Sequence, residues 1–290
     1  MRKRTGFRST PGKYSRRVTR GRAIPVFAAL LAATVATAHA AAGTGAAAPP
    51  TSRLPDLDQA APSQLSIVTV RRGGHILHRL AFASAVENRG QGDLILSGHR
   101  PSRRATRMTA DQLVERVDEA GRPVADQRVS DVGRLRYVRL RDHSHWHLIG
   151  FERYELRSVV TGRLAARDRK SGFCVGNRYT VVAGARPSDR SGQFDENCGK
   201  SRPGLLAVIE GLSPGWADDY KPNLEGQFLD VTSVPAGRYF LVHRTNVDGR
   251  LRASRRGNDA ASVLLALRRP RGAPPQVKVL RTCADAPTCH

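Results

Sequence analysis

Three histidines alternate with other residues in the short segment HSHWH, at His143, His145 and His147. The chain contains nine histidines, so a third of them lie within five residues. On a β-strand, residues two apart project from the same face and stand about 6–7 Å apart. Three imidazoles on one face can therefore converge on a single metal ion and leave a position open for water or substrate. Imidazole binds copper, zinc, nickel and iron, and copper(II) most tightly of the common divalent ions. The pattern therefore predicts a catalytic metal site, but it does not choose copper over zinc.

A solvated polar strand face, or a histidine patch that binds anions, would explain a single histidine in this segment. The strict alternation of three, with Trp146 and Leu148 on the opposite face, favours the metal site. The segment RLRYVRL at 134–140 alternates basic and apolar residues and leads directly to the histidines. The metal-site interpretation assumes that residues 145–157 continue the strand of 134–140.

The rest of the chain shows the period-two hydrophobic pattern of β-strands, with turn residues at short intervals. Strands are predicted at 64–70, 77–90, 92–98, 134–140, 261–269 and, as a pair around a Pro-Ala-Gly turn, within 226–245. The segment 109–121 could form a short helix, and the glycine-rich stretch 171–226 is expected to be rich in loops. The pattern predicts an all-β fold, an antiparallel β-sandwich-like single domain with long loops.

The N-terminus has the composition of an export signal. Residues 1–22 carry nine arginines or lysines and no acidic residue, and the apolar run that follows at 23–38 leads into the sequence AHA. We expect a signal peptide at 1–40, a disordered linker of small residues and prolines at 41–53, and the folded domain at 54–290. The apolar run is short for a membrane span, so we expect a secreted protein with no membrane span after signal cleavage.

The expected mature chain is strongly basic. Without the nine basic residues of the signal, 39 basic and 25 acidic residues remain, which is a net charge of +14. This charge favours adhesion to polyanions such as acidic cell-wall polymers, although solubility and a compositional preference for arginine also explain it. A specific nucleic-acid interface is not supported, because the sequence has no basic stripe interleaved with aromatic residues and no known binding motif.

The four cysteines are Cys174, Cys198, Cys283 and Cys289. In an exported chain an even number implies disulfides, and four cysteines allow three connectivities. The two pairs that are local in sequence, 174–198 and 283–289, are favoured. A zinc cluster is disfavoured because none of the spacings is C-x-x-C.

Several segments resemble the lysyl oxidase family, of the microbial kind, in family order and over most of the mature chain. The resemblance begins at LPDL (54–57), ends at the C-terminal cysteines, and includes LAFASAVENRGQGDLIL (80–96), HSHWH (143–147), FERYELR (151–157), RKSGFC (169–174), GLSPGWADDY (211–220) and QFLDVTSVPAGRYFLV (227–242). Each segment alone is a modest match. Together, in this order, they are specific to the family.

The resemblance implies a secreted, copper-dependent amine oxidase. The family's copper ligands fall on His143, His145 and His147, and its self-derived cofactor, lysine tyrosylquinone, falls on Lys170 and Tyr220. Such an enzyme oxidises primary amines to aldehydes and releases hydrogen peroxide and ammonia, with the quinone as electron sink. Peptidyl lysine and small primary amines are both candidate substrates.

Two other functions are compatible with parts of the sequence. An exported metal-binding or cell-wall adhesion module could keep the fold and the histidines without turnover, but the presence of both Lys170 and Tyr220 argues against it. A three-histidine zinc hydrolase lacks an obvious general base beside the motif.

The chain also departs from the family pattern, since animal members carry more cysteines and have a further histidine where Arg153 stands here. These departures leave the substrate range open.

The base that removes a proton from the substrate is not identified by the sequence. Asp218 and Asp219 lie close to Tyr220 along the chain, and we interpret both as carboxylates of a solvated loop. Tyr154 and Tyr239 stand in strand-like runs and are expected in the core.

Overall fold

The computed structural model describes residues 49–139, 144–170, 172–185, 194–195, 197–224 and 226–289. These residues belong to one compact unit. The signal peptide expected at 1–40 and the first candidate ligand, His143, lie outside the described residues.

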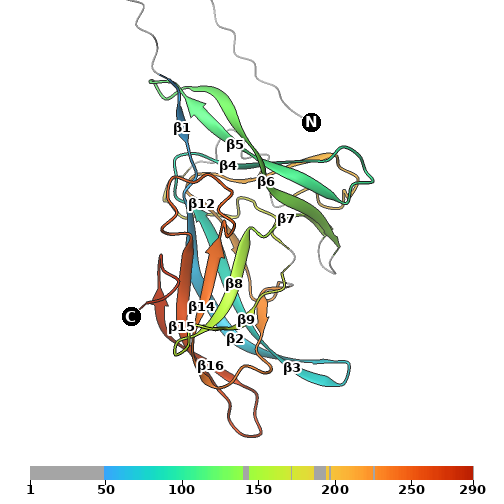
Figure 1. Ribbon diagram of the computed structural model, residues 1–290, viewed down its shortest axis with the longest axis vertical. Coiled ribbons are helices and arrows are strands. Elements are labelled where there is room, and N and C mark those ends of the chain that lie inside the picture. Colours follow the sequence, from blue (N-terminus) through green and yellow to red (C-terminus); the bar gives the residue numbers. More distant parts are fainter. Residues whose placement is uncertain are drawn as a thin grey trace, which may run out of the picture. The chain divides into compact units, whose positions relative to one another are not determined.

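The all-β prediction is confirmed, because every regular element in the described part of the chain is a strand and every strand pairing is antiparallel (Figure 1). The β5 sheet has the order β11-β4-β5-β6-β7, with β1 also paired to β5. Its strands are β1 (Thr51–Arg53), β4 (Leu94–His99), β5 (Arg107–Val117), β6 (Pro123–Arg139), β7 (Ser144–Ile149) and β11 (Ala207–Leu212). Among the described residues, no helix is long and apolar enough to cross a membrane.

Two further sheets complete the fold. The β3 sheet has the order β10-β12-β3-β13, with β2 also paired to β3, and its strands are β2 (Leu57–Arg72), β3 (His75–Asn88), β10 (Tyr179–Thr180), β12 (Trp216–Tyr220) and β13 (Phe228–Asp230). The β14 sheet has the order β16-β15-β14-β8-β9, and its strands are β8 (Glu152–Ser158), β9 (Leu164–Arg167), β14 (Gly237–Thr245), β15 (Ala260–Arg268) and β16 (Gln276–Cys283).

The hydrophobic core joins all three sheets. Strand β2 lies against β14, β15 and β16, so the β3 and β14 sheets face each other in the manner of a sandwich. Phe82 on β3, Trp146 on β7 and Tyr154 on β8 are fully buried members of the same core. Burial of these apolar side chains is the main favourable contribution to folding. Side chains of β7, β8 and β12 therefore pack into the same hydrophobic core.

Two expectations about the local elements are wrong. Residues 109–121 are not helical, because 107–117 form β5, whose even-numbered residues Met108, Ala110 and Val114 face the core. Pairing with β4 and β6 decides the conformation here, against a sequence that is also compatible with a helix. The expected linker ends earlier than 53, because residues 51–53 form β1 and pair with β5. The chain also continues past 261–269 into β16, which pairs with β15.

The strand of 134–140 does not continue through 145–157. Instead, β6 and β7 are antiparallel neighbours, and β8 belongs to a different sheet. The register places His147 opposite Arg136 and His145 opposite Val138. His145 and His147 still share one face, because they lie two residues apart on the same strand.

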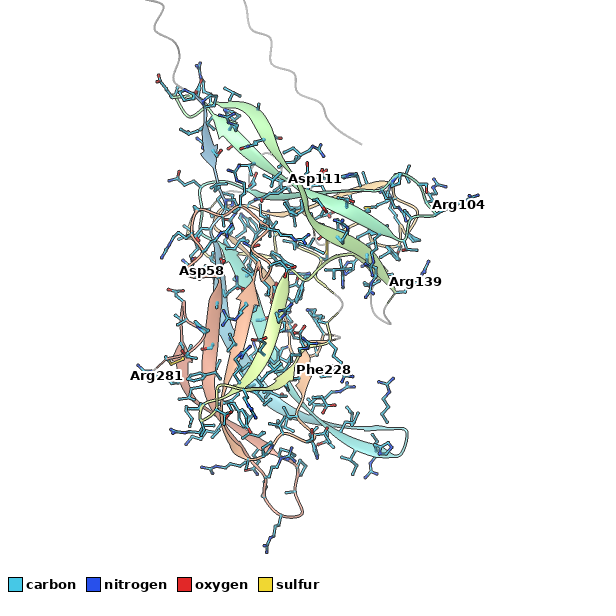
Figure 2. The ribbon with its side chains drawn as sticks, viewed as in Figure 1. Asp58, Arg104, Asp111, Arg139, Phe228 and Arg281 are labelled. Atoms are coloured by element: carbon cyan, nitrogen blue, oxygen red, sulfur yellow. A yellow bond between two sulfur atoms is a disulfide. The ribbon has the colours of Figure 1, made fainter. Side chains whose placement is uncertain are left out.

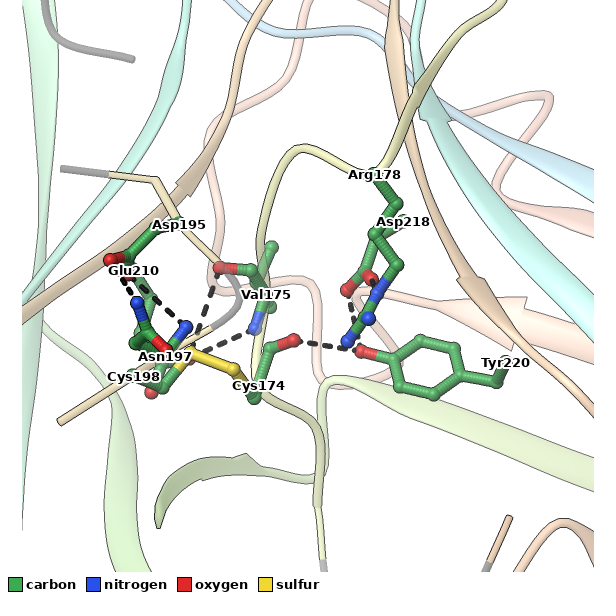
Figure 3. Close-up of a disulfide and its surroundings, with 9 residues drawn as sticks. All are labelled: Cys174, Val175, Arg178, Asp195, Asn197, Cys198, Glu210, Asp218 and Tyr220. Atoms are coloured by element: carbon green, nitrogen blue, oxygen red, sulfur yellow. Dashed lines mark hydrogen bonds and ion pairs between the residues drawn. A yellow bond between two sulfur atoms is a disulfide. The ribbon is translucent and has the colours of Figure 1, made fainter. Parts of the chain in front are cut away.

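The stretch 171–226 contains more regular structure than the expected loops, since it includes β10, β11 and β12. Its loop residues pair with the outer edge of β7: Leu148 and Phe173 exchange two backbone hydrogen bonds, and the Trp146 amide donates to the Cys198 carbonyl. Both favoured disulfides, 174–198 and 283–289, are confirmed. The Cys174–Cys198 bond, with a Cα–Cα distance of 5.8 Å, holds the two covering segments together (Figure 3).

Gly172 permits the close contact between this covering segment and β7. Its φ of +122° is a conformation that residues with a side chain rarely adopt. A Cβ at this position would lie 2.5 Å from the Leu148 carbonyl oxygen and 3.1 Å from the His147 Cβ. The segment that carries Lys170 can therefore approach the histidine strand only with glycine at 172.

We predict that Gly172→Ala lowers the free energy of unfolding by about 2 kcal/mol or more, because it combines backbone strain with a clash against backbone. Denaturant unfolding followed by tryptophan fluorescence measures this loss. The control is Gly162→Ala, whose φ is +65° and whose Cβ would meet no atom within 4 Å. Equal losses in the two variants would contradict the role assigned to the close contact.

Candidate active site around Lys170 and Tyr220

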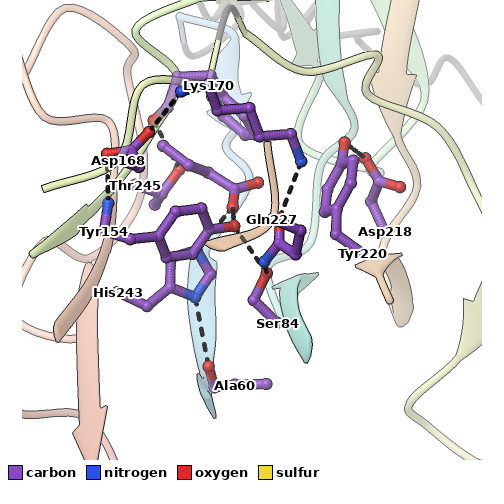
Figure 4. Close-up of polar contacts among 12 residues, drawn as sticks. Ala60, Ser84, Tyr154, Asp168, Lys170, Asp218, Tyr220, Gln227, His243 and Thr245 are labelled. Atoms are coloured by element: carbon purple, nitrogen blue, oxygen red, sulfur yellow. Dashed lines mark hydrogen bonds and ion pairs between the residues drawn. The ribbon is translucent and has the colours of Figure 1, made fainter. Parts of the chain in front are cut away.

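Lys170 and Tyr220 lie in contact, although 50 residues separate them in sequence. The Lys170 Nζ lies 3.8 Å from the centre of the Tyr220 ring and 4.1 Å from the centre of the Phe173 ring (Figure 4). Phe173 meets Tyr220 edge to face, with ring centres 4.9 Å apart. The structure thus brings the predicted pair together with the amine above the face of the phenol ring.

Strand β12 fixes the position of Tyr220. It pairs with β3 so that Tyr220 stands opposite Ser84. The Tyr220 hydroxyl lies 2.5 Å from Asp218 Oδ2 and 3.0 Å from the Cys174 carbonyl oxygen (Figure 3). The hydroxyl has one proton, so it can donate fully to only one of these acceptors. The disulfide-bonded Cys174 therefore contributes to placing the ring.

Asp218 is a buried residue of β12 and does not lie in a solvated loop, which corrects the expectation from sequence. Its side chain has no exposed surface and accepts a hydrogen bond from Arg178 Nε at 2.5 Å. Burial raises the pKa of the Asp218 carboxyl to about 7, even though the neighbouring Arg178 lowers it. Burial, and then the charge of Asp218, raise the pKa of the Tyr220 hydroxyl well above its usual value. The period-two pattern of WADDY, which places Asp218 and Tyr220 on one face, was the available sequence signal.

Lys170 is held by a hydrogen bond to a side-chain amide. Its Nζ donates to Gln227 Oε1 at 3.0 Å, and Gln227 is fully buried. Gly226, with φ of +78°, lets the backbone pack against the lysine stem, because a Cβ there would lie 3.1 Å from Lys170 Cγ. Burial lowers the pKa of the Lys170 amine to about 8, although Glu152, Asp218 and Asp168 act in the opposite direction. A substantial fraction of this amine is therefore neutral near pH 8.

A line of hydrogen bonds extends from Gln227 into the core between the sheets (Figure 4). The Gln227 amide nitrogen donates to Ser84 Oγ at 2.9 Å, and Ser84 Oγ lies 2.7 Å from the Tyr154 hydroxyl. Tyr154 donates to Glu152 Oε2 at 2.7 Å, and His243 Nε2 lies 2.7 Å from the same oxygen. Because Tyr154 uses its proton on Glu152, Ser84 must donate to Tyr154, which leaves Ser84 Oγ to accept from Gln227. This order presents the Gln227 carbonyl, and not its amide nitrogen, to Lys170.

Sequence reasoning missed most of this support. Tyr154 is in the core as expected, but it is also part of the hydrogen-bonded line. The residues that were not identified as functional are Ser84, Glu152, Arg178, Asp218, Gln227 and His243. Apart from the alternation that pairs Asp218 with Tyr220, their local sequence does not mark them, because most of their contacts are with residues far away in the sequence.

His145 and His147 are buried side by side, with ring centres 4.7 Å apart. Two imidazoles at this separation suit a shared metal ion that prefers nitrogen ligands, such as copper. His143 lies outside the described residues, and within the described ones no group of three potential ligands gathers at a point. The segment that carries Lys170 passes close to His147, because a Cβ on Gly172 would lie 3.1 Å from the His147 Cβ.

The chain is similar to known proteins over the same region. Residues 132–269 match the family model described as lysyl oxidase. Human lysyl oxidase homolog 1 is 29% identical over 105 residues, which is 36% of this chain and 16% of that protein. Pig protein-lysine 6-oxidase is 30% identical over 105 residues, which is 36% of each chain, and the human protein is 30% identical over 22% of its length. The match therefore spans well under half the length of these relatives.

We predict that the rate at which Lys170 reacts with an amine-acylating reagent is half-maximal near pH 8 and levels off above about pH 9, because the reactive form is the neutral amine and burial lowers its pKa to about 8. Peptide mapping of copper-free protein, labelled briefly at a series of pH values, measures the rate at each lysine. The exposed Lys278 provides the internal reference for the reagent. A Lys170 rate that keeps rising to pH 10 would contradict the desolvation of this amine.

Proposed function

Because residues 132–269 belong to the lysyl oxidase family, we propose that this chain is a secreted, copper-dependent amine oxidase. In this proposal Lys170 and Tyr220 form the lysine tyrosylquinone cofactor, and His143, His145 and His147 bind copper. The observation that carries the proposal is the position of the Lys170 Nζ, 3.8 Å from the centre of the Tyr220 ring. The chain would convert primary amines to aldehydes with release of hydrogen peroxide and ammonia.

The residues present fit such a cofactor. When formed, the quinone supplies an electron sink for the amine, and copper with oxygen supplies the oxidation of the ring that creates it. Lys170 is suited to add to the ring, because its amine is desolvated, partly neutral near pH 8 and held above the ring by Gln227. Asp218, with its pKa raised to about 7, can accept the Tyr220 hydroxyl proton at Oδ2. Arg178 beside it can stabilise the resulting negative charge.

Two classes of substrate, peptidyl lysine and small primary amines, are candidates. The relatives named protein-lysine 6-oxidase favour peptidyl lysine, and small primary amines are the second candidate. The alternative to catalysis is an exported metal-binding or cell-wall adhesion module on the same fold. The burial of a lysine amine against a phenol ring favours the oxidase, because burial of an amine is costly and adhesion has no need of it.

We predict that copper-loaded protein releases hydrogen peroxide when butylamine is added in air, and that Tyr220→Phe reduces this release to background. Phenylalanine lacks the hydroxyl from which ring oxidation starts, but it preserves the buried ring. The matched control is Tyr179→Phe on the exposed strand β10, which should retain the wild-type rate. A coupled peroxidase assay measures all three proteins.

Metal analysis of the same samples separates the oxidase from the adhesion module. His145→Ala with His147→Ala should remove most of the bound copper, whereas Tyr220→Phe should retain it. Amine-dependent peroxide release that persists in Tyr220→Phe would rule out the assigned cofactor. Copper binding without peroxide release in the wild type would favour the non-catalytic module.

A further inference from the structure

A hollow beside Lys170 is lined by an unusual number of arginines. Its volume is about 450 Å³, which lies in the range of ligand-binding pockets. The basic residues that line it are Arg107, Arg134, Arg136, Arg169, Lys170 and Arg250. The acidic residue among its described lining is Asp248. We refer to this hollow as the arginine pocket.

Three arginines of the pocket, Arg107, Arg134 and Arg136, lie on the same face of the β5 sheet as His145 and His147. Arg136 on β6 stands directly opposite His147 on β7, and opposite Arg107 on β5 across its other edge. Residues opposite each other on antiparallel strands project from the same face, with Cβ atoms about 5 Å apart. Lys170 therefore lines the pocket directly, and Arg136 of its lining is the cross-strand neighbour of the candidate ligand His147.

Several of these arginines lack a counter-charge within the protein. In the described part of the chain, the side chains of Arg107, Arg136 and Arg250 form no hydrogen bond or ion pair. Arg134 pairs with Asp131, and the charge of Arg169 acts on Asp230, whose pKa it helps to lower. The cross-strand pair of Arg107 and Arg136 places like charges directly opposite each other, which is unfavourable. A bound anion would offset this repulsion.

An arginine-rich composition alone would scatter such residues over the surface. Elsewhere, arginines close to carboxylates form ion pairs, as Arg128 does with Asp111 and Arg157 with Glu155. Figure 2 labels Asp111 on β5. The arginine pocket differs because it collects guanidinium groups without an ion pair from β5, β6 and the loop of Arg250 around one hollow. A second hollow beside Lys170, of about 790 Å³, carries both signs, with Glu152, Asp168 and Asp230 among its lining. The arginine pocket is therefore the more one-sidedly basic of the two hollows that Lys170 lines.

We propose that the arginine pocket binds carboxylates that flank the reacting amine, so that the preferred substrate is a lysine side chain in an acidic peptide. This inference rests on the proposed amine oxidase function and adds the class of substrate. The planar guanidinium group matches a carboxylate with two parallel hydrogen bonds, which a small amine without a carboxylate cannot form. The expected net charge of +14 repels a free cationic amine, whereas an acidic carrier is attracted.

The test uses two fluorescent pentapeptides with a central lysine, one flanked by glutamates and the other by glutamines. Their binding to the whole mature chain is measured by fluorescence polarisation without oxygen, so that no turnover occurs. We expect the glutamate peptide to bind at least about tenfold more tightly, and added salt of about 0.5 M to reduce this preference.

Three double variants locate the binding. Arg107→Gln with Arg136→Gln should weaken binding of the glutamate peptide about tenfold and leave that of the glutamine peptide nearly unchanged. Arg71→Gln with Arg72→Gln, on exposed positions at the end of β2, removes the same charge and should retain the preference. Arg107→Lys with Arg136→Lys replaces the glutamine variant if that variant folds poorly. It keeps the charge but loses the paired hydrogen bonds, so it should weaken binding of the glutamate peptide by an intermediate factor.

Equal weakening by the two glutamine variants, or no preference for glutamate in the wild type, would overturn the proposed pocket. The proposed oxidase function is judged separately, by peroxide release from butylamine in the wild type. If butylamine is oxidised and the glutamate preference is absent, the function stands and the substrate class fails. If the preference maps to the pocket but no amine is oxidised, the pocket stands as a carboxylate site and the oxidase function fails.

Discussion

The site depends on one contact, the placement of a desolvated lysine amine over the face of a phenol ring. An ammonium above an aromatic ring is attracted by the ring's negative face, but burial of the charge is costly and lowers the pKa of the amine. Lys170 combines both effects, at 3.8 Å from the centre of the Tyr220 ring and with a pKa of about 8. The contact therefore holds the amine in place while making its neutral, nucleophilic form available near neutral pH. The close approach of Gly172 to β7 and the disulfide at Cys174 fix the segment that follows the lysine.

The polar groups around this contact act in two sets. On the phenol side, Asp218 accepts a hydrogen bond from the Tyr220 hydroxyl and forms an ion pair with Arg178. On the lysine side, Gln227 begins a line of hydrogen bonds that ends at the buried pair of Glu152 and His243. Buried polar networks of this kind rigidify a site when their members are satisfied, and they are costly when one member is lost. They explain why the amine and the ring keep one relative position inside an otherwise apolar core.

The sequence predicted those features that depend on local pattern. The alternation of apolar and polar residues predicted the strands at 64–70 and 77–90, because each of these segments ends in clear turn residues. It failed at 109–121, where neighbouring strands decide the conformation, and it missed β12 because glycine and proline flank so short a strand. Motif resemblance identified Lys170 and Tyr220, but not the residues that hold them. Gln227 lies 57 residues from Lys170 and 143 from Ser84, so neither contact leaves a local signal.

The most direct test of the account is peptide mapping of copper-loaded, aerated wild-type protein by mass spectrometry after reduction and digestion. The account predicts one covalently linked peptide pair that joins the segment of Lys170 to the segment of Tyr220, absent from protein produced without copper. Fragmentation should place the bond between the lysine side-chain nitrogen and the tyrosine ring. The account would be contradicted if both peptides appeared separately and unmodified after full copper loading, or if Lys170 were linked to a different residue.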